Sequence, residues 1–192
     1  MKIGLFFGSY NPIHVGHMII ANHMVEFSDL EEVWFVVTPH NPFKKKDSLL
    51  ADHHRFQLVL EATEDYDKLK ASNIEFGLPQ PNYTINTLVH LCEKYPQHQF
   101  NLIMGQDNLY SFHKWKNHEE ILKNHELYIY PRITTEREVP DLFSHPKAHV
   151  IDAPIVEISA TFIRKSIKEN KNVRPLLPYK VWKYMDEMNF YK

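Results

Sequence analysis

The strongest constraint on the fold is the order in which apolar runs and helical patterns follow one another along the chain. The runs Ile3–Phe7 and Val33–Val37 contain no charged or hydroxyl-bearing side chain, and residues 16–27 between them carry apolar side chains at helical spacing. Such continuous runs are typical of strands buried on both faces, as in a parallel sheet. The alternation goes on, with helices near 53–63 and 84–95 and strands near 70–76, 100–104, 127–130 and 149–152. We therefore predict an α/β fold, a parallel sheet with right-handed crossovers and helices on both faces.

A single domain is expected to account for the whole chain, residues 1–192. A chain of this length forms one sizeable core and is short for two. Residues 159–191 are predicted to form two C-terminal helices, separated near Pro175 and Pro178. Cys92, the single cysteine, follows an apolar helical pattern and is predicted to be a core residue.

Charge and hydropathy exclude several classes of protein. The 22 Lys and Arg residues nearly balance the 24 Asp and Glu residues, so the formal net charge is −2 and a general nucleic-acid binder is not expected. The apolar run at the start of the chain is too short for a signal peptide or a membrane span. We therefore expect a cytoplasmic protein with neither nucleic acid nor membrane as a partner, in which any phosphate site is local.

Ligands of a parallel sheet bind at the carboxyl ends of its strands, and four segments directly follow predicted strands. They are residues 8–17, 39–46, 77–84 and 105–115, and they hold four of the five glycines. Glycine lets a backbone approach a ligand closely, although ordinary turns use it as well. The chemistry of the chain is expected in these segments.

His14 and His17 stand three residues apart at the start of the first predicted helix. At this spacing both imidazoles can face one point, beside the backbone N–H groups and the positive end of the helix dipole. Gly16 between them lacks a Cβ that would hold a phosphate at a distance. Among 13 histidines such a pair also arises by chance, so the pair alone indicates an anion site only weakly.

Two longer strings carry a resemblance to a known superfamily. Residues 8–17 read Gly-Ser-Tyr-Asn-Pro-Ile-His-Val-Gly-His, directly after the first strand, and residues 158–164 read Ile-Ser-Ala-Thr-Phe-Ile-Arg. In sequence, order and spacing both resemble the signatures of the nucleotidyltransferases, the superfamily of adenylyl- and cytidylyltransferases.

Three further segments narrow the resemblance. Residues 39–44 (Pro-His-Asn-Pro-Phe-Lys), 82–84 (Asn-Tyr-Thr) and 105–109 (Gly-Gln-Asp-Asn-Leu), with Phe112 and Trp115, are similar to nicotinate-nucleotide adenylyltransferases. The resemblance covers nearly the whole chain. It implies a Rossmann-like fold and the transfer of AMP from ATP to nicotinate mononucleotide, giving deamido-NAD and pyrophosphate in NAD biosynthesis. It also implies Mg²⁺ as the cofactor and a direct displacement without a covalent enzyme intermediate.

The resemblance assigns roles to individual residues. His14, His17 and Arg164 are the expected catalytic residues, donating hydrogen bonds to the charge that builds on the phosphates, since adenylyl transfer needs positioning and charge neutralisation more than a nucleophilic side chain. The residues expected to bind ATP are Gly8, Ser9, His14, Gly16, His17, Asp107, Ser159, Thr161 and Arg164. The residues expected to bind nicotinate mononucleotide are Ser9, Tyr10, Lys44, Tyr83, Thr84 and Trp115, with Trp115 stacking on the pyridine ring.

Two positions depart from the pattern of many relatives. Phe7 replaces a second glycine before Gly8, which is expected to alter packing more than chemistry. Asn11 replaces an aspartate, so a charge is lost beside the phosphate site. No side chain is therefore assigned as a metal ligand, and Mg²⁺ is expected to arrive on the phosphates of ATP.

Several alternatives remain open at the level of the sequence. The two nucleotidyltransferase strings indicate ATP binding and say little about the acceptor. The acceptor could therefore be nicotinamide mononucleotide or phosphopantetheine. A non-catalytic nucleotide sensor is a further alternative, although the expected phosphate donors are all present. A zinc site has little support, because no CxxC occurs and Leu122 stands where a helical zinc motif would need histidine. The sequence also leaves open whether the chain forms a homo-oligomer.

Overall fold

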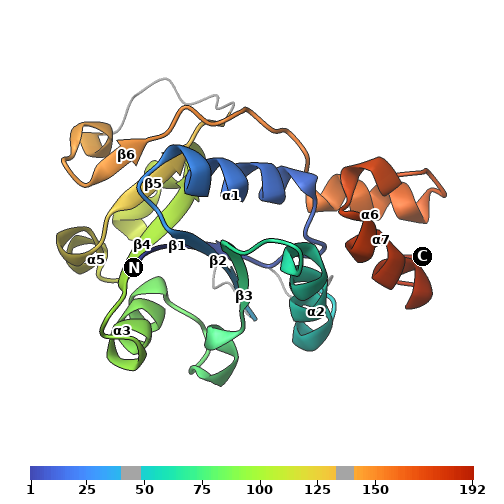
Figure 1. Ribbon diagram of the computed structural model, residues 1–192, viewed down its shortest axis with the longest axis horizontal. Helices are drawn as coiled ribbons and strands as arrows, with labels where there is room; N and C mark the ends of the chain where they lie inside the picture. The colour runs from blue at the N-terminus through green and yellow to red at the C-terminus, as the bar shows by residue number, and fades with distance from the viewer. Residues whose placement is uncertain (40–48, 133–140) are drawn as a thin grey trace.

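The computed structural model describes residues 1–39, 49–132 and 141–192. Of the site residues predicted above, Lys44 lies outside these ranges. Strands and helices alternate as the sequence predicts (Figure 1).

In the described part of the chain the strands are β1 (Lys2–Gly8), β2 (Glu32–Val37), β3 (Leu69–Ser72), β4 (Gln99–Gly105), β5 (Leu127–Tyr130) and β6 (Ala148–Val150). The helices are α1 (Val15–Phe27), α2 (Asp52–Thr63), α3 (Thr84–Lys94), α4 (Gln106–Leu109), α5 (His118–Asn124), α6 (Ala160–Lys168) and α7 (Tyr179–Glu187). Short 3-10 helices are η1 (Ile74–Gly77), η2 (Phe112–Lys114), η3 (Asp141–Ser144) and η4 (Arg174–Leu176).

The strands form one parallel sheet in the order β3-β2-β1-β4-β5-β6. This is the strand order of the Rossmann fold, so the predicted fold class is confirmed. The chain leaves the centre of the sheet in one direction through β2 and returns to the other side at β4. The loops after β1 and β4 therefore diverge at a topological switch point, where a crevice for a ligand forms.

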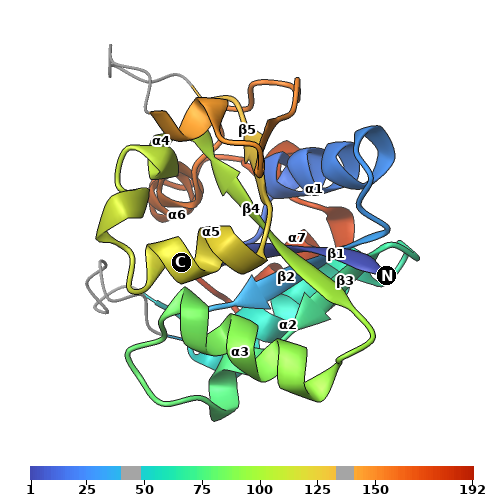
Figure 2. The same ribbon diagram turned by 90° about the vertical axis from the view of Figure 1, so that its left-hand side faces the viewer.

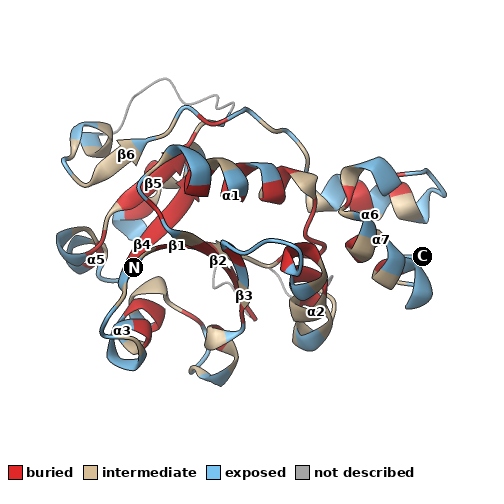
Figure 3. Ribbon diagram, in the orientation of Figure 1, coloured by how far each residue is buried: buried red, intermediate tan, exposed pale blue. Residues whose placement is uncertain are grey.

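The sheet is buried between two cores, one on each face. Alternate side chains of β1 supply both, with Ile3 and Leu5 packed on α3 and α5, and Phe6 packed on the side of α1 and α2. Figure 2 shows α1 and α3 on opposite sides of the strands, and Figure 3 shows the inner strands β1, β2, β4 and β5 as largely buried. Val181 and Met185 of α7 join the core of α1 and α2, so the C-terminal helices pack against the same domain.

Two expectations differ from the structure in detail. The strand predicted near residues 70–76 ends at Ser72, and its last part forms η1. The prediction that Cys92 is a core residue was wrong, because Cys92 is exposed. Leu88 and Leu91 form the buried stripe of α3, and the next residue along a helix points about 100° away from its predecessor.

The length and hydropathy of the helices bear on whether the chain can cross a membrane. Over residues 1–39, 49–132 and 141–192, none is long and apolar enough to cross a membrane.

Candidate active site

The loop between β1 and α1 brings the two predicted histidines into contact. His14 is the N-cap residue of α1 and His17 lies in its first turn. The two rings stack with their centroids 3.7 Å apart, and the His14 backbone N–H donates to Nδ1 of His17 over 3.3 Å. Because Nδ1 of His17 accepts this bond, the neutral ring carries its proton on Nε2, the nitrogen that can donate to an anion.

Burial controls the charge of His14. The side chain is 4% exposed, and burial, followed by the positive charge of Arg132, lowers the pKa of His14 to about 4. His14 is therefore neutral near pH 7. Its buried Nδ1 makes no hydrogen bond within the described residues, and it lies 3.1 Å from the position that a Cβ at Gly16 would take.

Glycine is required in this loop for close packing. A Cβ at Gly16 would lie 2.9 Å from Val156, and a Cβ at Gly8 would lie 2.7 Å from the ring of Tyr10. Both distances are shorter than real contacts allow. The space beside Gly16 is thus used by protein atoms, which differs from the reason that the sequence suggested.

Tyr10 lies in the core and not in an open pocket. Its φ is 46°, its side chain is buried, and its hydroxyl donates to the carbonyl of Phe6 over 2.5 Å. A contact between Tyr10 and a mononucleotide would therefore involve the backbone. The neighbouring Ser9 is partly buried, and its carbonyl accepts a hydrogen bond from Arg55 over 2.6 Å.

The second predicted signature reaches the same loop from the far end of the sequence. Ser159 is the N-cap of α6 and accepts from the Phe162 backbone N–H over 3.1 Å. Arg164 donates to the carbonyl of Asn11 over 2.7 Å and to Oγ1 of Thr161 over 3.3 Å. Residues 153 positions apart in the sequence thus meet beside the histidine pair.

A cavity of about 700 Å³ opens beside this cluster, over the ends of β1 and β4. Three of the residues predicted to bind the mononucleotide, Tyr83, Thr84 and Trp115, all line it. Phe6 also lines it, and the ring centroid of Phe6 lies 6.1 Å from that of His17. The phosphate-side cluster therefore lies next to the aromatic cavity, with Phe6 between them.

A buried carboxyl group forms part of the cavity wall. Glu75 is 2% exposed, accepts from the Thr87 hydroxyl over 2.7 Å, and its Oε2 has no hydrogen-bond partner within the described residues. Burial raises the pKa of Glu75 above its ordinary value, and the hydrogen bond from Thr87 partly offsets this shift. Sequence reasoning did not select Glu75, because nothing local marks it as buried.

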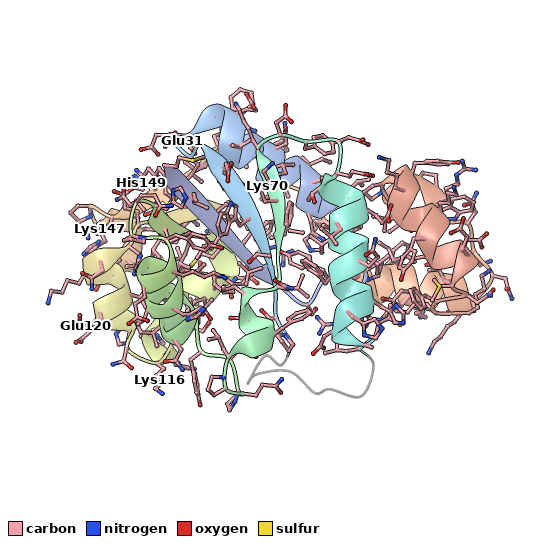
Figure 4. All side chains as sticks on the ribbon, turned by 60° about the horizontal axis from the view of Figure 1, so that its bottom comes forward. Glu31, Lys70, Lys116, Glu120, Lys147 and His149 are labelled. Atoms are coloured by element: carbon pink, nitrogen blue, oxygen red, sulfur yellow. The ribbon has the colours of Figure 1, made fainter. Side chains whose placement is uncertain are left out.

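The rim of the cavity carries two cations that sequence reasoning also missed. Lys114 and Lys116 flank Trp115, and Nζ of Lys116 lies 4.6 Å from the centroid of the Tyr83 ring. Figure 4 shows Lys116 at the edge of the molecule. Their position next to Trp115 in the sequence was the available signal.

Arg55 is a further residue that the sequence did not reveal. It is 0% exposed and donates to the carbonyls of Ser9 (2.6 Å), Thr38 (2.9 Å) and Leu50 (3.1 Å) and to Asp52 (2.6 Å). It therefore joins the end of β2 to the loop after β1. Nothing in the local pattern around residue 55 distinguishes this arginine from a solvated one.

Asp107 follows β4, as predicted, and stands apart from the histidine pair. Its Oδ2 lies 3.7 Å from Arg132, and its Oδ1 lies 2.5 Å from where a Cβ at Gly105 would be. Both side chains are about half exposed, so their ion pair is weak and a ligand could replace it.

The described residues offer little to a bound metal ion. No group of three or more His, Cys, Asp or Glu side chains is arranged to hold one in the part of the chain that the structure describes. Oδ1 of Asn11 already accepts from the Tyr191 hydroxyl over 2.6 Å and from the Leu50 backbone N–H over 3.2 Å. Asn11 therefore serves the structure of the loop and is a poor metal ligand.

Known proteins share both the sequence and the fold. A family model described as cytidylyltransferase-like matches residues 5–166. A protein of Flavobacterium johnsoniae called a probable nicotinate-nucleotide adenylyltransferase is 68% identical over all 192 residues of both chains. One of the same name from Cytophaga hutchinsonii is 50% identical over 100% of this chain and 98% of its own.

The fold is also that of a solved structure. The Plasmodium falciparum nicotinic acid mononucleotide adenylyltransferase, complexed with NaAD, superposes with a TM-score of 0.81 over 99% of this chain and 97% of its own, at 20% identity. The chain therefore belongs to the cytidylyltransferase-like family and, within it, to the nicotinate-nucleotide adenylyltransferases.

Proposed function

We propose that the chain transfers the AMP part of ATP to nicotinate mononucleotide in NAD biosynthesis. In this reaction a phosphate oxygen of the mononucleotide attacks the α-phosphorus of ATP. The new P–O bond forms as the bond between the α-phosphorus and the bridging oxygen breaks, and pyrophosphate leaves with the bond electrons. The attacking phosphate is already ionised near pH 7, so no base is needed to activate it. The cytoplasm is the proposed location of this ATP-consuming reaction.

The observation that carries this proposal is the meeting of two unlike sites at the switch point of the sheet. One is a cluster of imidazole and guanidinium groups beside the N-terminus of α1, suited to phosphates. The other is a largely aromatic cavity suited to a flat heterocycle. Joining a triphosphate to a pyridine mononucleotide requires both, side by side.

On the ATP side, the chain's own groups supply position and positive charge. His17 Nε2–H and the guanidinium of Arg164 would donate to phosphate oxygens, with neutral His14 packed against His17 as a second donor. Ser159 and Thr161, both exposed at the start of α6, can add hydroxyl donors. Gly8, Ser9 and Gly16 would contribute backbone N–H groups, and Asp107 would contact the ribose of ATP or nearby atoms. Preorganised donors of this kind typically contribute a factor of about 10² to 10³ each to turnover.

On the acceptor side, the cavity wall offers stacking and hydrogen bonds. Trp115 would stack on the pyridine ring, with Thr84 and Tyr83 at its edge. Ser9 and Tyr10 would act through their backbones, and the proposed phosphate contact of Lys44 lies outside the described residues. We extend the set to Lys116, whose charge favours a carboxylate over an amide at the cavity rim.

Magnesium ions are proposed to enter with ATP. The described side chains form no cluster for a metal, so Mg²⁺ would remain on the phosphate oxygens, where it neutralises charge.

The proposal is tested by measuring pyrophosphate release with ATP and Mg²⁺ in parallel reactions with nicotinate mononucleotide, nicotinamide mononucleotide and phosphopantetheine. We expect release with the nicotinate form at a kcat/KM at least tenfold above the others. Preference for another acceptor would contradict the assignment of the cavity, and binding of ATP without release in any reaction would indicate a sensor.

A further inference from the structure

Asn11 is the point at which three distant segments hold the phosphate-side loop. It is 2% exposed and lies three residues before His14. Its backbone carbonyl accepts from Arg164 over 2.7 Å, so the position of Asn11 sets the position of that guanidinium. Its side-chain oxygen accepts from the Leu50 backbone N–H over 3.2 Å and from the hydroxyl of Tyr191 over 2.6 Å.

Tyr191 reaches this point from beyond the end of α7. Its backbone has a φ of 64°, and its ring lies 6.3 Å from that of Phe190, which in turn packs 4.8 Å from His54 of α2. The tail is thus turned inward and fixed by aromatic contacts. Burial raises the pKa of Tyr191, so its hydroxyl keeps its proton and acts as a donor at physiological pH.

The Tyr191 hydroxyl donates over 2.6 Å to the side-chain oxygen of Asn11, and the backbone carbonyl of the same residue accepts from Arg164 over 2.7 Å. The guanidinium of Arg164 donates to the Asn11 carbonyl, so any movement of that carbonyl also moves the guanidinium. A group that stabilises developing charge must be held in place before the reaction, because reorienting it during the reaction costs free energy.

We propose that Tyr191 is a positioning residue for adenylyl transfer: its hydroxyl fixes Asn11, and Asn11 fixes Arg164 and the loop that carries His14. This inference rests on the proposed function and goes beyond it, because Tyr191 lies outside both signatures of the superfamily. Tyr191 itself touches no substrate in this account.

The predicted effect separates two kinetic constants. A loosened Arg164 weakens an interaction that matters most in the transition state, so kcat should fall. The acceptor cavity is lined by other segments of the chain, so the KM for the mononucleotide should hardly change.

The test is Tyr191→Phe, which removes one oxygen atom, with Tyr179→Phe as the matched control. Tyr179 lies in the first turn of α7 and is 60% exposed. For Tyr191→Phe we expect kcat to fall about 5- to 10-fold, with the KM for nicotinate mononucleotide within twofold of the wild-type value and the unfolding temperature nearly unchanged. Tyr179→Phe should behave as the wild type.

The result that overturns the inference is a Tyr191→Phe enzyme with wild-type kcat, or one in which kcat falls only in proportion to a loss of folded protein. ATP affinity, measured by calorimetry without an acceptor, distinguishes a failure of the Tyr191 inference from a failure of the proposed function. If the wild type releases no pyrophosphate but binds ATP, the function fails. The inference then stands only if Tyr191→Phe binds ATP about threefold more weakly, and equal affinity overturns it.

Discussion

At the scale of single residues, the burial of His14 couples the stability of the protein to pH. In the folded chain the pKa of His14 is about 4, below the value of about 6.5 expected when it is unfolded. As the pH falls below about 6.5, His14 binds a proton in the unfolded chain but stays neutral in the folded chain. The contribution of His14 to the free energy of unfolding is therefore fully present above that pH and is lost toward pH 4.

The corresponding prediction compares wild type with His14→Gln in urea unfolding at pH 7.5 and pH 5. The wild type should lose about 2 kcal/mol more of its free energy of unfolding across this interval than the variant does. Equal losses in the two proteins would contradict the burial of a neutral imidazole.

Lys116 carries the prediction for acceptor choice. Replacing it in Lys116→Gln should lower kcat/KM for nicotinate mononucleotide about 5-fold and leave that for nicotinamide mononucleotide unchanged, because only the acid offers a carboxylate to the cation. Lys70→Gln, on the edge strand β3, is the control. An equal loss with both acceptors would show that Lys116 supports packing and does not select the acid.

At the scale of elements, α2 stabilises the site through one buried side chain. Arg55 donates to four backbone carbonyls and pairs with Asp52, and removing it would leave buried acceptors without donors. Arg55→Lys keeps the charge but cannot reproduce the fork of five donors.

We expect Arg55→Lys to lower the free energy of unfolding by about 3 kcal/mol, measured by urea titration. Asp52→Asn should cost much less, because Asp52 is 41% exposed. A loss below 1 kcal/mol in Arg55→Lys would mean that the carbonyls find other donors.

Sequence reasoning succeeded wherever information is local. The continuous apolar runs predict β1 and β2 closely, because a strand buried on both faces needs no polar side chains. The prediction that Cys92 is buried failed, because a residue one position further along a helix lies on a different face. Arg55 and Tyr191 could not be found, because their roles arise from contacts between residues 46 and 180 positions apart.

At the scale of the whole molecule, the two ends of the sheet have different tasks. The carboxyl ends of the strands carry the site, and the amino ends are held by charged groups. Lys2 Nζ lies 2.5 Å from Asp29 and 2.7 Å from Glu126. Glu126 also accepts from the Tyr128 hydroxyl and lies 3.1 Å from Nε2 of His149. These contacts join the amino ends of β1, β5 and β6.

This division predicts that stability and activity can be separated. Glu126→Gln should lower the free energy of unfolding by about 1–2 kcal/mol at pH 7 and leave turnover unchanged, as checked by calorimetric unfolding and pyrophosphate release. The hydrogen bond from Lys2 lowers the pKa of Glu126, so this contribution is present above about pH 4.5 and should be lost as the pH falls below it. A change in turnover without a change in stability would contradict the division.

The central claim is that the cluster after β1 transfers adenylyl groups directly to a pyridine mononucleotide. It is tested most directly with ATP labelled at the α-phosphate, mixed with nicotinate mononucleotide and either the wild type or His17→Ala. The wild type should move the label into the dinucleotide at the rate of pyrophosphate release, with none on the protein, and folded His17→Ala should be slower by about 10² to 10³. Label retained on the protein, or a normal rate in His17→Ala, would contradict the account.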